Sequence, residues 1–381
     1  MVLKVMTVIG TRPEAIKMAP VIRSLMNYAG EIESVVCVTA QHREMLDQAL
    51  TIFGIIPDYD LNLMQPDQSL SRLTANILIA LDEVITIEKP DWILVQGDTT
   101  TAMVASLVAY YHQIKLGHVE AGLRTSDKFH PFPEEINRRI TDILADAYFA
   151  PTENSRMNLL REGICPESVV VTGNTVIDAL MMISQRIADR PLPSHISAST
   201  ENRLLILVTV HRRESFGEPL ENVCKALAKI ARSYSDRVQI VFPVHLNPNV
   251  RKTVYQFLSE IHNISLIEPV NYEELVGLMS KAYLLMTDSG GIQEEAPGLH
   301  KPVLVLRDVT ERPEAIEAGA ARLIGTDTER IYAETIRLIE DSQSYHDMSH
   351  AVNPYGDGRA GQRIVNFLLG QPIEKIVDHS W

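Results

Sequence analysis

Cysteine is scarce in this 381-residue sequence, which contains Cys37, Cys165 and Cys224. Three scattered cysteines exclude a disulfide framework and a CxxC metal motif, and they are typical of a protein in a reducing compartment. The sequence also lacks a Walker A motif, an HExxH motif and any Cys/His metal spacing. We therefore predict neither a P-loop nor a metal site.

Long apolar runs are absent as well. No stretch approaches the ~18 apolar residues that a membrane span requires. The first residues, MVLKVMTVIGTRPEA, contain too short an apolar run for a signal peptide and no cleavage site. We therefore expect a cytoplasmic protein without a membrane partner.

Basic residues are fewer than acidic ones: the sequence has 35 Lys and Arg and 49 Asp and Glu, which gives a formal net charge of −14. An acidic chain is a poor partner for nucleic acids and anionic membranes, although a local basic pocket for an anionic small molecule is compatible with it. The hydrophobic content of 45% and charged content of 22% are those of a soluble globular protein.

Strand-length apolar runs alternate with segments of helical period along the whole chain. Apolar strands joined by helices indicate parallel sheets covered on both faces, so the predicted fold class is α/β, doubly wound. The candidate strands are Val5–Ile9, Val35–Thr39, Trp92–Gln96, Ile114–Val119, Ala147–Ala150, Val169–Thr172, Leu204–Val210, Val238–Pro243, Ser265–Glu268, Leu284–Thr287, Val303–Leu306 and Ala321–Ile324. The candidate helices include Ile16–Tyr28, Leu70–Glu88, Thr100–Tyr111, Ile136–Ala145 and Gln362–Leu369.

The chain length suits two domains better than one very large domain. The segment 190–202, RPLPSHISASTEN, interrupts the alternation and is the predicted inter-domain region. We expect two Rossmann-like halves with a cleft between them. The N-terminal domain would comprise residues 1–172 with the C-terminal helix 359–381, and the C-terminal, nucleotide-binding domain would comprise residues 173–358.

The segment Leu284–Pro297, LLMTDSGGIQEEAP, predicts a strand, a tight turn at Asp288–Gly291 and a helix from Ile292. Adjacent glycines let a ligand approach the backbone, and the first N–H groups of a helix favour an anion. The segment is therefore a candidate phosphate holder. An ordinary βα turn, with glycine for tightness, explains it equally well at this level.

The sequence Arg-Pro-Glu-Ala-Ile occurs twice, at Arg12–Ile16 and Arg312–Ile316, each time after a strand and a polar turn. Proline at the first helical position and glutamate in the first turn both favour a helix start. The arginine would then lie just outside a helix N-terminus, where a phosphate would contact both. Two copies, one in each half, suggest a diphosphate clamp.

Polar residues that directly follow strands are candidates for a site, because ligands in open α/β sheets bind beyond the carboxyl ends of the strands. Carboxylates come mainly from the first half, and phosphate-type groups mainly from the second. The candidates are Arg12, Lys17, Gln41, His42, Arg43, Asp98, Glu120, His211, Arg212, Arg213, His245 and the Ser-Gly-Gly turn, with Glu134 at a helix start.

Each candidate has a structural alternative. Asp98 could cap the helix that follows it, and the charge of Glu134 could interact favourably with the dipole of its own helix. His211 could be a structural histidine at a strand end whose ring nitrogens are hydrogen-bonded. Glu120 is harder to explain by packing, since an acid directly after a buried strand is costly.

A dinucleotide cofactor is not expected. The sequence after the first strand is GTRPEA rather than a glycine-rich fingerprint, and the formal GxGxxG match at Gly356–Gly361 follows no strand. We interpret that match as a loop that caps the last helix.

Ten stretches in one order resemble the non-hydrolysing UDP-N-acetylglucosamine (UDP-GlcNAc) 2-epimerases of bacteria over essentially the whole chain. They are GTRPEAIKMAP (10–20), QHREMLD (41–47), VQGDTTT (95–101), HVEAGLRT (118–125), PFPEEINRR (131–139), VTGNTVIDAL (171–180), TVHRRESFG (209–217), DSGGIQEEAP (288–297), ERPEA (311–315) and NPYGDGRA (353–360). The resemblance implies a glycosyltransferase-B-like (GT-B-like) fold, usually as a homodimer, and interconversion of UDP-GlcNAc and UDP-ManNAc for cell-surface polysaccharides.

The resemblance also implies roles for individual residues, with no cofactor. The positions that match the catalytic residues of the family are Asp98, Glu120, Glu134 and His211. Those that match nucleotide contacts are Arg12, Lys17, His245, Ser289, Gly290, Gly291, Glu295 and Arg312. Those that resemble a second, allosteric UDP-GlcNAc site of some members are Gln41, His42, Gln68 and Arg212.

Three other functions fit part of the same pattern. A glycosyltransferase of this fold would share the Ser-Gly-Gly turn and Glu295 but would not need three carboxylates. A hydrolysing relative would release ManNAc and UDP, and a sensor would bind the nucleotide sugar without changing it.

Overall fold

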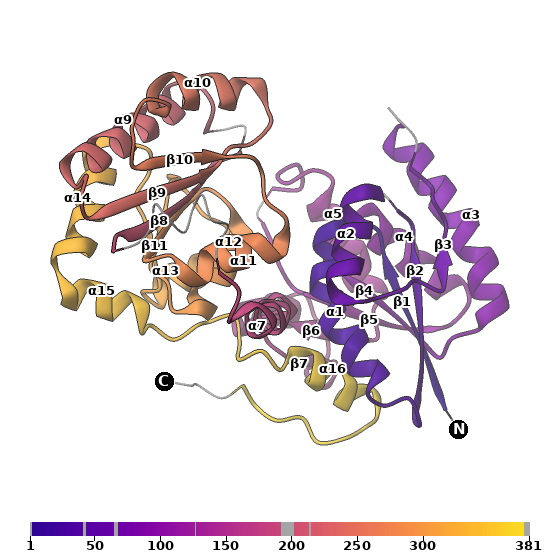
Figure 1. Cartoon of the computed structure of the whole chain (residues 1–381). Helices are drawn as coiled ribbons and strands as arrows, with labels where there is room; N and C mark the ends of the chain where they lie inside the picture. Colours follow the sequence, from indigo (N-terminus) through magenta and orange to yellow (C-terminus); the bar gives the residue numbers. More distant parts are fainter. Residues whose placement is uncertain are drawn as a thin grey trace. The chain divides into compact units, whose positions relative to one another are not determined.

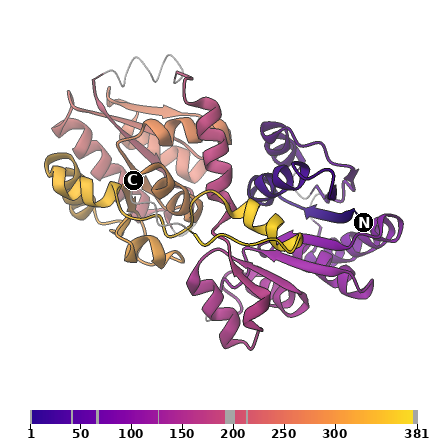
Figure 2. The ribbon, with the colours of Figure 1, turned by 90° about the horizontal axis from the view of Figure 1, so that it is seen from below.

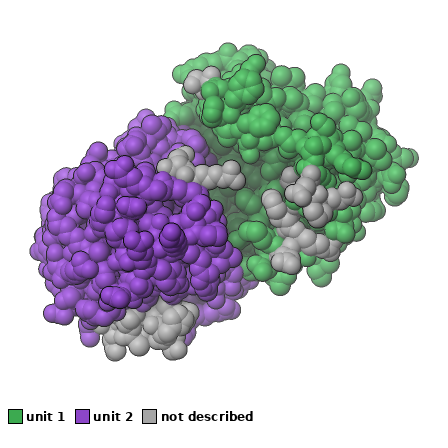
Figure 3. Space-filling view, turned by 90° about the horizontal axis from the view of Figure 1, so that it is seen from above, with its two compact units in different colours: residues 1–179, 355–377 green, residues 180–354, 378–381 purple. Residues whose placement is uncertain are grey.

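The computed structural model describes residues 2–40, 43–64, 68–125, 127–191, 202–212 and 215–376, except for the side chains of residues 43 and 44. The chain divides into two compact units (Figure 3). Unit 1 comprises residues 1–179 and 355–377, and unit 2 contains residues 180–354. The division falls within α7 (Thr175–Ile187), not in the segment 190–202 where composition predicted it.

Unit 1 contains a seven-stranded, all-parallel sheet in the order β3-β2-β1-β4-β5-β6-β7. Its strands are β1 (Leu3–Ile9), β2 (Ile32–Val38), β3 (Tyr59–Asp60), β4 (Trp92–Gln96), β5 (Lys115–Val119), β6 (Ala147–Ala150) and β7 (Val169–Val171). Its helical segments are α1 (Arg12–Met26), α2 (Arg43–Phe53), α3 (Leu70–Glu88), α4 (Thr100–Tyr111), α5 (Glu134–Leu144), α6 (Glu153–Arg161), η1 (Pro166–Ser168), α16 (Ala360–Leu368) and the start of α7.

Unit 2 repeats this topology with six parallel strands in the order β10-β9-β8-β11-β12-β13. The strands are β8 (Leu204–Thr209), β9 (Val238–Pro243), β10 (Ile264–Ile267), β11 (Leu284–Thr287), β12 (Val303–Val305) and β13 (Ala321–Leu323). The other elements are α9 (Glu218–Ser233), α10 (Pro248–Leu258), α11 (Tyr272–Lys281), α12 (Gly290–Glu295), η3 (Ala296–Leu299), α13 (Pro313–Glu317), α14 (Thr328–Glu340) and α15 (Ser342–Ser349).

Two parallel α/β sheets confirm the predicted fold class. The strands are buried along most of their length because helices cover both faces, which is why they read as continuous apolar runs. In unit 1, α3, α4 and α5 pack in sequence along one face, and α1 contacts α2 and α16 (Figure 1). In each sheet the first strand pairs with the fourth, so the strand order reverses there, at the position where α/β proteins bind ligands.

The two Arg-Pro-Glu-Ala-Ile segments begin their helices differently. Pro313 opens α13 and Arg312 is its N-cap, as predicted. In the first copy the N-cap is Thr11, so Arg12 is the first helical residue rather than lying outside the helix. The helix after β11 starts at Gly290 instead of Ile292, which places both glycines in its first turn.

The C-terminal helix α16 belongs to unit 1 and lies against α1, as its yellow ribbon shows in Figures 1 and 2. The ring of Phe367 meets those of Phe149 and Trp92 edge-on, at centroid distances of 5.3 and 6.3 Å. None of the described helices is long and apolar enough to cross a membrane.

Arg363 on α16 is 2% exposed and forms a two-pronged ion pair with Asp357, with N–O distances of 2.6 and 2.7 Å. It also donates to the carbonyl oxygens of Thr172 and Glu374 at 3.0 and 2.8 Å. One guanidinium thus joins α16, the loop before it and the end of β7. Such bidentate geometry compensates the desolvation of both charges.

We expect Arg363→Ala to lower the free energy of unfolding by about 3–5 kcal/mol, because it leaves the Asp357 carboxylate buried without its cation. Urea denaturation measures the loss. Arg359→Ala is the matched control, since the Arg359–Glu374 pair is 56% and 71% exposed and should contribute less than about 1 kcal/mol. Equal losses in the two variants would contradict this account of the C-terminal segment.

Candidate functional site

Asp98 follows β4 in unit 1, one residue beyond Gly97, whose positive φ of 69° turns the chain. Asp98 does not cap the next helix. Thr99 does so, because its side chain accepts a hydrogen bond from the N–H of Ala102 at 3.0 Å. The capping alternative for Asp98 is therefore wrong, and its carboxylate is left for other contacts.

The Asp98 carboxylate is 28% exposed and lies 2.6 Å from Nη2 of Arg138. Its main-chain carbonyl accepts a hydrogen bond from Nδ2 of Asn137 at 2.9 Å. Burial raises the pKa of Asp98, and the charges of Glu120 and Glu134 add to that rise, while Arg138 and Lys17 oppose it. A carboxyl group with a raised pKa exchanges protons more readily near neutral pH.

Glu120 follows β5, the strand next to β4, and is 7% exposed. Its φ of +66° is unusual for a residue with a side chain and costs free energy that surrounding contacts must offset. Those contacts come from Nζ of Lys17 at 2.5 Å, Nδ2 of Asn174 at 3.3 Å and the side-chain amide of Gln96. Glu120 is thus a buried carboxyl group contacted by at least three donors.

Glu134 is the first residue of α5 and half-buried, a position compatible with the helix-dipole alternative. It is also close enough for its charge to affect Asp98. The structure therefore brings together the three carboxylates that the sequence singled out, Asp98, Glu120 and Glu134, in unit 1.

Glu14 is a fourth carboxylate of this region whose position the sequence analysis did not foresee. It is 1% exposed and accepts hydrogen bonds from the N–H of Gly10 and the hydroxyls of Thr11 and Thr99, at 3.2, 2.7 and 2.8 Å. Burial raises its pKa to about 7, against the effect of these donors. Glu14 ties the turn after β1 to the residue that follows Asp98.

In unit 2, the carboxylate of Asp288 organises the end of β8. It is fully buried and accepts hydrogen bonds from the N–H groups of His211 and Arg212 and from the hydroxyl of Ser215, at 2.8 to 3.1 Å. Asp288 therefore fixes the loop that carries His211 next to the turn at Ser289.

Ser289 is the N-cap of α12, and Gly290 and Gly291 are its first two residues. A Cβ on Gly290 would meet its nearest neighbour, Nη2 of Arg212, at 3.6 Å, and one on Gly291 would meet Oγ of Ser289 at 3.9 Å. Both distances are ordinary contacts, so packing alone does not require glycine at either position. Close approach of a ligand to the backbone would explain both.

The ring of His211 is stacked with that of His245, with a centroid distance of 6.2 Å. Nδ1 of His211 lies 3.3 Å from the Asp288 carboxylate, and the side chain is 45% exposed. Burial lowers the pKa of His211, with smaller contributions from His245 and Arg212, and Asp288 opposes the shift. The two histidines predicted after β8 and β9 are therefore neighbours.

Arg312 pairs with Glu294, which is 3% exposed, through its Nε. Glu295, the last residue of α12, is buried, and Arg12 is half-buried at the start of α1. In unit 2, Arg312 thus contacts α12, the helix that begins at the Ser-Gly-Gly turn. In unit 1, Lys17, which follows Arg12 on α1, contacts Glu120.

The four residues of the candidate second site are described only in part. Gln41 and His42 lie outside the described residues. Gln68 belongs to unit 1, where its Nε2 contacts Sδ of Met64 at 3.3 Å. Arg212 belongs to unit 2 and lies 3.5 Å from the carboxylate of Glu311.

Several partners of the carboxylates were missed from the sequence: Gln96, Arg138, Asn137, Asn174 and Thr99. Gln96 is the last residue of β4, and Thr99 and Asn174 follow strands by three residues, so inspecting strand ends could have found them, whereas Asn137 and Arg138 lie within α5, where that rule does not apply. A usable signal existed for α5, where Asn137 and Arg138 follow Glu134 by three and four residues and so share its face. Among the described residues, no group of three or more His, Cys, Asp and Glu side chains could hold a metal ion.

The two all-parallel α/β units place the chain in the class of GT-B-like folds. Within that class the family is also clear. The family model for UDP-N-acetylglucosamine 2-epimerase matches residues 25–369. This chain belongs to the UDP-N-acetylglucosamine 2-epimerase family.

The relatives match over nearly their full length. The UDP-N-acetylglucosamine 2-epimerase of Salmonella typhimurium is 56% identical over 96% of this chain and 98% of its own. A solved UDP-GlcNAc 2-epimerase from Neisseria meningitidis, bound to UDP-GlcNAc, is 50% identical with a TM-score of 0.86, covering 97% of this chain and all of that one. A putative 2-epimerase from Listeria monocytogenes is 45% identical with a TM-score of 0.93, covering 99% of this chain and all of that one.

We expect Glu14→Gln to become more stable relative to the wild type as the pH rises from about 5 to 8. The folded pKa of about 7 exceeds the ordinary 4.5, so the folded state must ionise a buried acid in this window, and the wild type loses stability that the amide retains. The difference should approach about 3 kcal/mol, at about 1.4 kcal/mol per pKa unit.

Urea denaturation at several pH values measures this difference. Glu83→Gln removes one carboxylate from an exposed position on α3 and is the control, expected to run parallel to the wild type. A Glu14→Gln curve that also stays parallel to the wild type would show that Glu14 does not resist ionisation in the fold.

Proposed function

We propose that this protein is a non-hydrolysing epimerase that interconverts UDP-GlcNAc and UDP-ManNAc by inverting C2 of the sugar. The observation that carries the proposal is the cluster of Asp98, Glu120 and Glu134, in which burial and neighbouring charge raise the pKa of Asp98. The names of the relatives and the UDP-GlcNAc bound to the Neisseria protein support the substrate.

The chemistry explains why a cluster of carboxylates is needed. The hydrogen on C2 is beside an acetamide nitrogen and not α to a carbonyl, so removing it directly as a proton is unfavourable. Elimination avoids this difficulty. A base takes the C2 proton, the C1–C2 double bond forms, and UDP departs with the electrons of the C1–O bond, giving 2-acetamidoglucal.

Return of UDP to C1, with a proton delivered to the opposite face of C2, completes the inversion. One group must act as a base on one face and another as an acid on the other. Asp98, Glu120 and Glu134 are the candidates for these two roles. The raised pKa of Asp98 suits proton transfer near neutral pH, whereas Glu120 is paired with the ammonium group of Lys17.

The residues of unit 2 suit the diphosphate. The N–H groups of Gly290 and Gly291, the hydroxyl of Ser289 and the ring of His211 would stabilise UDP as negative charge develops on it. Arg12 would add a positive charge, and Glu295 would accept hydrogen bonds from the ribose. The remaining nucleotide contacts would come from Lys17, His245 and Arg312.

The reaction as written needs no cofactor, because it transfers protons and UDP only. The homodimer, the cytoplasmic location, the supply of precursors for cell-surface polysaccharides and the second site at Gln41, His42, Gln68 and Arg212 are further parts of the proposal. The division into domains at residues 172 and 359 also stays a prediction.

Incubation with UDP-GlcNAc alone in D2O tests the reaction. We expect UDP-ManNAc to form, with deuterium at C2 of both nucleotide sugars, and without any acceptor. Proton NMR follows the C2 and anomeric signals, and the same mixture without protein is the control.

Each rival function predicts a different spectrum. Free ManNAc and UDP would indicate a hydrolysing enzyme, and turnover that depends on an added acceptor would indicate a glycosyltransferase. Bound but unchanged UDP-GlcNAc, without exchange at C2, would indicate a sensor and contradict the proposal.

Two substitutions separate the proposed roles. Asp98→Asn should lower kcat by about 10²–10⁴-fold while keeping the affinity for UDP within about twofold, because proton transfer contributes that much and the proposed role of Asp98 is at C2 of the sugar, not at UDP. Gly290→Ala should weaken UDP binding by about 10-fold or more, because the new methyl group obstructs charge-assisted hydrogen bonds to the backbone.

Calorimetric titration with UDP and initial rates measure both effects. The free fold should tolerate Gly290→Ala, since the added Cβ would be 3.6 Å from its nearest neighbour. Unchanged UDP affinity in Gly290→Ala, or equal loss of UDP binding in Asp98→Asn, would contradict the division of roles.

A further inference from the structure

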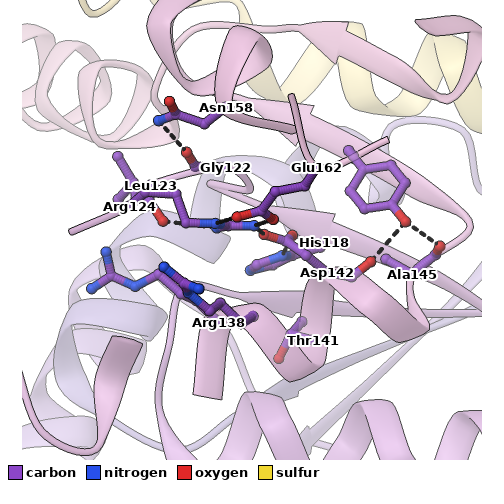
Figure 4. A network of polar contacts seen from close by, with 12 residues as sticks. His118, Gly122, Leu123, Arg124, Arg138, Thr141, Asp142, Ala145, Asn158 and Glu162 are labelled. Carbon is purple, nitrogen blue, oxygen red and sulfur yellow. Dashed lines mark hydrogen bonds and ion pairs between the residues drawn. The ribbon is translucent and has the colours of Figure 1, made fainter. Parts of the chain in front are cut away.

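His118 lies within β5 and is fully buried, two residues before Glu120. Its Nδ1 is 2.5 Å from a carboxylate oxygen of Asp142, and its Nε2 is 2.8 Å from the carbonyl oxygen of Gly97. Figure 4 shows the ring of His118 beneath the Asp142 carboxylate. The histidine therefore bridges α5 and the turn that carries Asp98.

The two hydrogen bonds of His118 determine which ring nitrogens carry hydrogen. A carbonyl oxygen can only accept, so Nε2 must donate to Gly97. Burial raises the pKa of Asp142, but the neighbouring His118 and Arg124 lower it overall. The hydrogen on Nε2 is therefore the one that reaches the Gly97 carbonyl, while Nδ1 is bound to Asp142.

The carbonyl that His118 holds belongs to the peptide bond between Gly97 and Asp98. The N–H of Gly97 donates to the carbonyl of Val119 at 3.0 Å, so both polar groups of this glycine are bound to β5. Since Gly97 has no Cβ to restrict its φ, these two hydrogen bonds set the orientation of the peptide that leads into Asp98.

Asp142 also reaches the loop that follows Glu120. Its second carboxylate oxygen lies 2.7 Å from Nη2 of Arg124, which is paired with Glu162 as well, at 2.6 and 2.8 Å. Nη1 of Arg124 donates to the carbonyl of Leu123 (Figure 4). One buried carboxylate thus connects the turn before Asp98 with the loop after Glu120.

The same helix supplies the direct contacts to Asp98. Along α5, Glu134 is followed at intervals of three, four and eight residues by Asn137, Arg138 and Asp142, which places all four on one face. Asn137 and Arg138 contact Asp98 directly, and Asp142 reaches the preceding peptide through His118. Two of the three candidate carboxylates, Glu134 and Asp98, are therefore positioned by α5.

We propose that His118, held by Asp142, is a positioning residue that orients the Gly97–Asp98 peptide for the epimerase reaction. It acts through Asp98 and contacts neither substrate nor reacting atoms. The inference rests on the proposed function. A buried His–Asp pair that only fills the core would be indifferent to which ring nitrogen is replaced, whereas a positioning role depends on the donor at Nε2.

Two substitutions separate these donors, because the amide nitrogen of glutamine is placed near Nε2 of histidine and that of asparagine near Nδ1. We expect His118→Gln to retain kcat within about 10-fold of the wild type. His118→Asn should lose about 100-fold in kcat, the size of effect that a displacement of about 1 Å produces at a reacting group. In both variants KM and UDP affinity should stay within about threefold.

Urea denaturation of each variant shows how much of any loss comes from unfolding, and Asp178→Asn is the matched control. Asp178 is a 6% exposed carboxylate of unit 1 that accepts a hydrogen bond from the N–H of Gly361, outside this network. The Asp178→Asn variant should therefore keep the kcat of the wild type. Asp142→Asn should behave like His118→Asn. The ring 15N signals of His118 should show hydrogen on Nε2 in the wild type, and a ring without hydrogen there would contradict the assigned contact with Gly97.

Equal kcat losses in His118→Gln and His118→Asn, or none in either, would overturn the proposal. A wild type without exchange at C2 would contradict the proposed function instead. In that case the backbone amide signals of Gly97 and Asp98 decide the inference: they should shift in His118→Asn and not in His118→Gln, and equal shifts would overturn it.

Discussion

Carboxylates withdrawn from water at the ends of parallel strands impose the main constraint on this molecule. A buried carboxylate is tolerated only where donors surround it, because desolvation of an unpaired charge costs several kcal/mol. Glu120 is compensated by Lys17 from α1, Gln96 from β4 and Asn174 from the start of α7. The need to compensate one side chain thus brings to Glu120 residues that are up to 103 positions away from it in the sequence.

The same constraint takes a different form in unit 2. Asp288 is fully buried and is compensated mainly by main-chain N–H groups and the hydroxyl of Ser215, not by a cation at short distance. The consequence is that a carboxylate before the Ser-Gly-Gly turn holds the loop of His211 in place. In unit 1 two carboxylates of the proposed proton transfers, Asp98 and Glu120, are paired with basic side chains. In unit 2 the main-chain N–H groups at the start of α12 are suited to bind an anion.

The sequence predicted the strands well, because strands buried on both faces are apolar along their length. It missed β3, which has two residues and no apolar run. It also singled out Asp98 and Glu120, since ligands in α/β sheets bind beyond the strand ends, and Glu134 from its place at a helix start; their catalytic roles stay predictions. It could not predict that Arg138 pairs with Asp98 or Asn174 with Glu120, because such pairing depends on how distant elements pack. The helix-dipole interpretation of Glu14 was incomplete for the same reason: three donors from two turns surround it only in the fold.

The proposed mechanism requires the C1–O bond to break while unit 2 retains UDP. Positional isotope exchange tests it most directly, with UDP-GlcNAc that carries 18O in the bridge between C1 and the β-phosphorus. We predict that 18O moves into non-bridging positions of the β-phosphate, seen as 31P isotope shifts, as deuterium enters C2. Exchange at C2 with all of the 18O still in the bridge would contradict the account.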